Sequence, residues 1–147
     1  MIPEAMELAV EPERWRHLVR AAEGGERVSE RLLLNDRVEV WLICWERGHD
    51  TGFHDHDRSA GTVVVLEGAV REDQLVVGGP PSTQVVRAGE SFSFDAADIH
   101  RVTHLEGEPA VTIHAYSPPL HSMGAYEVTE EGRLRRTPLS AATSLSA

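Results

Sequence analysis

Two histidines separated by one residue, His54 and His56, have the spacing of a metal-binding pair. Alternate residues of a β-strand point to the same face of a sheet, so both imidazoles could bind one metal ion. Histidine pairs of this kind also occur on protein surfaces. Glycines at Gly48, Gly61 and Gly68 flank the pair at intervals of five, four and six residues. Metal binding is therefore the first chemistry that the sequence predicts.

Short apolar or alternating segments, separated by turn residues such as those at 78–81, must position this pair. Many short strands at regular spacing predict an all-β sandwich or barrel. The segments that we expect to form strands are residues 31–34, 38–45, 62–67, 74–77, 83–86, 91–94, 100–104 and 110–116.

The two ends of the chain have a different composition. Residues 1–27 predict a helical segment on the outside of the barrel, in which Pro12 opens a helix and Trp15 and Leu18 follow at helical spacing. Residues 28–136 then form the barrel domain. Residues 137–147, rich in Ser, Ala and Thr, are expected to form a flexible tail.

The spacing around His54 and His56 resembles the first motif of the cupins, with Gly61 at the position of the usual glutamate ligand. A second motif follows, in which Gly89 and His100 match the family in identity and the other positions match in spacing. The resemblance implies a small jelly-roll β-barrel that holds a metal ion on His54, His56 and His100.

Three neutral imidazoles suit Fe(II), Zn, Cu or Ni and are poor ligands for Mg or Ca. Zinc in such a site usually activates a water molecule, whereas non-haem iron leaves positions open for substrate and oxygen. Without a carboxylate ligand the metal keeps its full positive charge, which favours an anionic substrate ligand such as a thiolate.

Residues 31–123 resemble the type I cysteine dioxygenases in their shorter, bacterial, arginine-type form. Such enzymes add both atoms of O2 to the sulfur of a thiol and give a sulfinate. The resemblance implies a small thiol substrate, with L-cysteine as first choice, Fe(II) as the metal and O2 as co-substrate. The matching segments are residues 43–45, 48–49, 54–57, 66–68, 99–102 and 114–119.

The same resemblance assigns roles to residues beyond the metal ligands. Arg31 corresponds to the arginine that binds the substrate carboxylate, with Arg37 as a competitor for that role. Thr112, His114 and Tyr116 alternate on one strand and are similar to the family's Ser-His-Tyr relay. In this relay His114 orients the catalytic hydroxyl of Tyr116, which also contacts the substrate.

Two further positions bear on the subgroup and the substrate. The mammalian enzymes carry a cysteine, crosslinked to the tyrosine, where this chain has Gly61, so we expect no Cys–Tyr crosslink and a free phenol at Tyr116. Met123 is expected at the substrate site, where the related 3-mercaptopropionate dioxygenases have a second arginine. Both Arg31 and Met123 therefore favour the cysteine branch.

Alternatives in function remain open from the sequence alone. The substrate could be another small thiol such as 3-mercaptopropionate, or the barrel could be a non-catalytic metal-binding sensor. A zinc or nickel hydrolase or isomerase is a third alternative, for which no general base is evident beyond His114. Among other polar residues, Asp57 and Asp98 could orient ligand imidazoles, and His104 is expected in a loop or at the surface.

Composition limits the remaining classes. The 147 residues carry a formal net charge of −10, and all 14 basic residues are arginines, so we expect no nucleic-acid or membrane partner. Cys44 is the single cysteine, which excludes an intrachain disulfide and favours a reducing compartment. We expect a cytoplasmic protein that is a monomer or a weak homo-oligomer.

Overall fold

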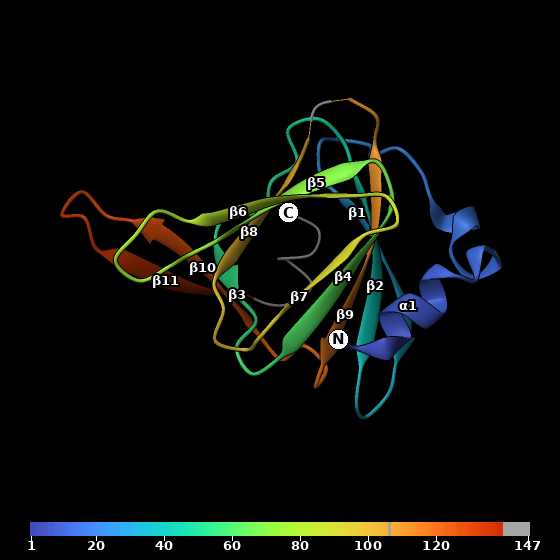
Figure 1. Cartoon of the computed structure of the whole chain (residues 1–147), viewed down its shortest axis with the longest axis horizontal. Coiled ribbons are helices and arrows are strands. Elements are labelled where there is room, and N and C mark those ends of the chain that lie inside the picture. Colours follow the sequence, from blue (N-terminus) through green and yellow to red (C-terminus); the bar gives the residue numbers. More distant parts are fainter. Residues whose placement is uncertain (106, 140–147) are drawn as a thin grey trace.

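Two antiparallel sheets form a barrel in the computed structural model, which describes residues 1–105 and 107–139 (Figure 1). Five strands form one sheet in the order β1-β2-β9-β4-β7, and six form the other in the order β11-β10-β3-β8-β5-β6. The predicted all-β barrel with a short N-terminal helix is confirmed.

The strands of the five-stranded sheet are β1 (Val28–Leu34), β2 (Glu39–Trp45), β4 (Ala60–Glu67), β7 (Ser91–Phe94) and β9 (Ala110–Ser117). The strands of the six-stranded sheet are β3 (His54–Asp55), β5 (Ala69–Gln74), β6 (Ser82–Arg87), β8 (His100–His104), β10 (Met123–Val128) and β11 (Leu134–Leu139).

The central strands of the five-stranded sheet, β2, β9 and β4, are buried on both faces, and strand periodicity divides their side chains between two cores. On β2, Val40, Leu42 and Cys44 pack in an outer core with the N-terminal segment. Ile43 and Trp45 point the opposite way, into an inner core between the sheets. This division leaves one face of each strand available for the site in the barrel interior.

The N-terminal helix begins earlier than the sequence predicts. Helix α1 spans Pro3–Ala9, and the expected helix after Pro12 is replaced by two 3-10 turns, Pro12–Arg14 and Arg16–Leu18. Between these turns Trp15 has a φ of −137°, outside the helical range, and its side chain is buried in the outer core. Burial of this indole therefore overrides the helical spacing.

No helix in residues 1–105 or 107–139 is long and apolar enough to span a bilayer.

Strand β1 begins three residues earlier than expected, the short strand β3 is not among the expected segments, and three further strands differ more. Strand β5 covers 69–74 instead of 74–77. The sequence does not indicate this strand, because acidic residues usually indicate a turn, whereas Glu72 and Asp73 are buried in the structure. Strands β10 and β11 were not expected at all. The predicted tail from 137 overlaps β11 at its first three residues, and its remainder, 140–147, lies outside the described residues.

The packing of α1 on the sheet can be tested by truncating Leu8, which is 4% exposed. Leu8→Ala should lower the free energy of unfolding by about 2–5 kcal/mol in urea denaturation, because it leaves a cavity in the outer core. Met6→Ala, on the exposed side of the same helix, is the control. An equal loss for both variants would show that α1 does not pack stably on the sheet.

Candidate metal centre

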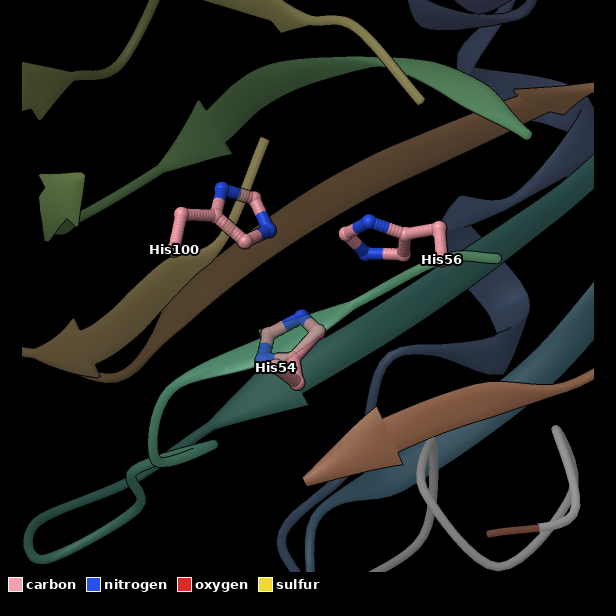
Figure 2. A group of neighbouring side chains, drawn as sticks. All are labelled: His54, His56 and His100. Carbon is pink, nitrogen blue, oxygen red and sulfur yellow. The ribbon is translucent and has the colours of Figure 1, made fainter. Parts of the chain in front are cut away.

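Three histidines meet in the barrel interior (Figure 2). His54 lies in β3, His56 follows directly after that strand, and His100 begins β8. One ring nitrogen of each lies within 4.8 Å of the others, and all three side chains are buried. The structure thus brings together the three histidines that the sequence selects as metal ligands.

Strand pairing explains how residues far apart in sequence converge. His54 lies directly opposite His100 in the antiparallel pair of β3 and β8, which brings their side chains to one face. His56 is two residues further along and points the same way. Its ring packs against Phe94 of β7 and Tyr116 of β9, so this histidine reaches the other sheet.

Asp55 points away from the metal site and ties this segment to the β10–β11 hairpin. Its carboxylate accepts hydrogen bonds from the Tyr126 hydroxyl at 2.6 Å and from Arg136 Nε at 2.8 Å. Burial alone would raise the pKa of Asp55, but these bonds lower it to about 2. The hairpin therefore fixes the backbone between the two ligand histidines.

Two of the imidazoles are oriented by hydrogen bonds from Nδ1. His54 Nδ1 donates to the carbonyl oxygen of Gly52 at 2.9 Å, and His100 Nδ1 lies 2.8 Å from Glu72 Oε2. Because these acceptors hold the Nδ1 protons, the Nε2 lone pairs of both rings are left for a metal ion.

The sequence did not identify Glu72, because it lies in a charged stretch that resembles a turn. The acids expected to orient the imidazoles do not contact them in the described structure. Asp57 is exposed, and the Asp98 carboxylate accepts a hydrogen bond from the Asp95 backbone instead.

Burial also keeps the ligands in the form that binds metals. Desolvation, with a smaller effect of the His100 charge, lowers the pKa of His54 to about 3. Desolvation likewise holds the pKa of His56 well below its usual value. Neutral imidazoles with converging nitrogens fit a divalent transition-metal ion and do not fit Mg or Ca.

A cavity of about 140 Å³ adjoins His54 and His100. Its remaining polar lining comes from Arg27, Asp50, Thr51, His114 and Tyr116, and its apolar lining comes from Ile43, Trp45, Val102, Met123, Ala125 and Leu139. Met123, which the sequence assigns to the substrate site, is among these lining residues. Drug-sized ligands need roughly 300 Å³ or more, so this cavity fits a small molecule.

The arginine that lines the cavity is Arg27, whereas the sequence predicts Arg31 or Arg37. Val28 pairs with Cys44, so the preceding Arg27 lies beside Trp45, with its guanidinium carbon 5.0 Å from the indole centroid. Arg31 is half-exposed and four residues further along, roughly 13 Å at strand rise, where it lies 3.6 Å from Glu39. Arg37 is exposed.

Thr112, His114 and Tyr116 form a hydrogen-bonded chain along the inner face of β9. The Thr112 hydroxyl oxygen accepts a hydrogen bond from Trp45 Nε1 and lies 2.8 Å from His114 Nε2. His114 Nδ1 lies 3.2 Å from the Tyr116 hydroxyl. Burial lowers the pKa of His114 to about 3 and raises that of Tyr116, so both groups are uncharged near neutral pH.

Two other histidines have structural partners. His104, expected in a loop or at the surface, is buried in β8, and its Nε2 donates to the Glu108 carbonyl oxygen at 2.8 Å. His49 Nδ1 accepts a hydrogen bond from the Glu46 backbone, and its Nε2 donates to the carbonyl oxygen of Gly25. The side chain of His104 is on the inward-facing side of β8. His104 therefore has a structural role in this strand and is not at the surface.

Comparison with known proteins agrees with the arrangement of the three histidines. The family model of cysteine dioxygenase type I matches residues 2–129. The chain belongs to this family. It is 28% identical to cysteine dioxygenase type 1 of Homo sapiens over 102 residues, 63% of this chain and 51% of the human protein. Identity to the Danio rerio enzyme is 30% over 103 residues, with the same coverage.

This cysteine dioxygenase family member spans about half the length of the curated relatives that it matches. Among solved structures it is similar to a conserved protein with a double-stranded beta-helix domain from Klebsiella pneumoniae, with a TM-score of 0.63 and 18% identity. The match covers 74% of this chain and 84% of that one. The barrel therefore has the cupin, or double-stranded β-helix, fold.

The role of Glu72 can be tested by Glu72→Gln, which keeps the shape of the side chain and removes its charge. We expect metal affinity to fall about 10- to 100-fold in a chelator competition titration, because His100 loses its charged hydrogen-bond partner. Asp73→Asn, at the neighbouring buried acid, is the control. Equal affinities of Glu72→Gln and the wild type would show that Glu72 does not act on the site.

A pH dependence is expected from Asp50, whose carboxylate pairs with Arg101 and accepts a hydrogen bond from Gly52 N. Burial would raise the pKa of Asp50, but these partners lower it. The carboxylate therefore stabilises the fold above its unfolded pKa of about 4, and this contribution is lost as the pH falls through the folded pKa.

This contribution can be measured by denaturant unfolding between about pH 7 and about pH 3. These pH values bracket the reference carboxyl pKa of about 4. Asp50→Asn should be less stable than the wild type at the upper end, and the difference should shrink toward the lower end. Asp36→Asn, in an exposed turn, is the control. A constant difference across the range would exclude the charge of Asp50 as the cause.

Proposed function

We propose that this protein is an iron-dependent thiol dioxygenase that converts L-cysteine to cysteine sulfinate. The observation that supports the substrate is the position of Arg27, a buried cation on the wall of the cavity that adjoins His54 and His100. Family membership and the three-histidine site support the thiol dioxygenase chemistry.

In this proposal Arg27 binds the substrate carboxylate. A guanidinium group presents parallel N–H donors that match the two oxygens of a carboxylate, and it stays charged although burial lowers its pKa. Contact with the Trp45 ring limits where the guanidinium can lie. The carboxylate is then held at a fixed place relative to the histidines, which orients the thiol group of a substrate as small as cysteine.

His54, His56 and His100 would hold Fe(II) at the end of the cavity. A bound iron would supply the reaction of the thiolate with O2, and because both oxygen atoms of O2 enter the sulfinate, no external reductant is needed. Apolar residues such as Ile43 and Val102 exclude water from the sulfur.

Tyr116 completes the proposed site as a neutral hydrogen-bond donor. When the Thr112 hydroxyl donates to His114 Nε2, the neutral imidazole carries its proton on Nδ1 and donates to the Tyr116 oxygen. The Tyr116 O–H is then directed into the cavity, toward the substrate carboxylate. His114 acts through Tyr116 and positions it.

The proposal is tested by O2 uptake and sulfinate analysis on iron-loaded protein, with L-cysteine, 3-mercaptopropionate and cysteamine at equal concentrations. We expect L-cysteine to be the best substrate. Arg27→Gln should raise the KM for L-cysteine about 10- to 100-fold, because it removes a hydrogen bond to a charged group worth about 1.5–3 kcal/mol. The KM for cysteamine, which lacks a carboxylate, should not change.

Arg31→Gln is the matched control, since Arg31 is in β1, the strand that Arg27 directly precedes, but lies outside the cavity lining. A raised KM in Arg31→Gln and not in Arg27→Gln would refute the proposed binding site. A clear preference for 3-mercaptopropionate would retain the dioxygenase and refute cysteine as the substrate. Iron-loaded protein that oxidises none of the three thiols would favour a metal-binding sensor.

A further inference from the structure

His56 differs from the other two ligand histidines in what orients its ring. The Nδ1 atoms of His54 and His100 have hydrogen-bond acceptors, whereas His56 Nδ1 is buried and has no hydrogen-bond partner among the described residues. Buried polar atoms without a partner are uncommon in native structures. The orientation of this imidazole must therefore come from packing.

The packing is supplied by Phe94, which is 5% exposed. Its ring stacks on the His56 ring with a centroid distance of 4.3 Å and an interplanar angle of 27°. The same ring lies 4.4 Å from the His100 centroid and 6.4 Å from that of Tyr116. One phenyl group therefore packs closely against two ligand histidines, and the tyrosine of the site lies further from it.

A glycine makes room for this ring. Gly61 of β4 is the direct cross-strand partner of Phe94 on one side and of Tyr116 on the other. A Cβ at Gly61 would lie 2.1 Å from Phe94 Cζ, so the phenyl ring covers the glycine where a side chain would otherwise be. An aromatic ring over a cross-strand glycine is a known way to pack a sheet.

We propose that Phe94 is the positioning residue for His56, with Gly61 required to admit its ring. Stacking on Phe94 does for His56 what the Nδ1 hydrogen bonds do for His54 and His100. This inference rests on the metal site of the proposed function and does not depend on which thiol, if any, is oxidised.

The test is Co(II) titration of metal-free protein, in which competition with a chelator gives the affinity and the visible absorption of Co(II) reports the ligand geometry. Phe94→Leu should lower Co(II) affinity about 10- to 100-fold and change the absorption spectrum, since the imidazole loses its support. Gly61→Ala should have the same effect while keeping the phenyl group, because the added methyl displaces the ring.

Phe92→Leu is the matched control on the same strand. Phe92 is buried like Phe94, but its ring lies 6.2 Å from His100, and none of the described ring contacts joins it to His56. It should lose thermal stability much as Phe94→Leu does, and keep the wild-type Co(II) affinity and spectrum. This separates positioning of the ligand from a general loss of core packing.

Co(II) affinities of Phe94→Leu and Gly61→Ala within about twofold of the wild type, with unchanged spectra, would overturn the proposal. If Phe94→Leu does not fold, Gly61→Ala alone decides. Wild-type protein that binds no Co(II) overturns this inference together with the metal site. Wild-type protein that binds Co(II) but oxidises no thiol overturns the proposed function and supports this inference if the variants behave as expected.

Discussion

Burial of three imidazoles at one point of the barrel is the constraint on which the rest of the site depends. Desolvation lowers the pKa values of His54 and His56 and so keeps them ready to bind a cation. The same burial means that each ring needs a partner inside the protein, because water does not orient it. Gly52 and Glu72 serve two of the rings by hydrogen bonds, and the third is packed by an aromatic side chain.

The two sheets contribute different parts of the site. The six-stranded sheet carries His54, His100 and the Glu72 carboxylate, and the β10–β11 hairpin fastens it through Asp55. The five-stranded sheet carries the Thr112–Tyr116 chain, and Arg27 directly precedes its edge strand β1. The distance from His54 and His100 to Arg27 and Tyr116 is therefore set by how the sheets pack. The outer core beneath α1 contributes to the site by holding the five-stranded sheet in place.

The sequence predicted features with a strict local period or spacing. The His54–His56 pair, its spacing to His100, and the alternation of Thr112, His114 and Tyr116 are properties of single strands or motifs. The cupin barrel follows from the same motifs and from the succession of short strands. Such patterns do not depend on which strands pair or in what register.

Features that depend on register or tertiary burial were not predictable in this way. Arg27, directly before β1, and Arg31 within it lie an even number of positions apart, and only the pairing of Val28 with Cys44 decides which of them lies beside Trp45. Glu72 is buried in a charged stretch, where the local pattern indicates a turn, and Trp15 breaks a helix that its own spacing favours.

The charge of the cavity depends on the placement of Arg27, which the sequence did not predict. His114 and Tyr116 are neutral, and of the described lining residues Arg27 and Asp50 carry formal charges, with Asp50 paired to Arg101. A cationic Arg27 attracts anions, so the cavity suits a small molecule that carries a negative charge.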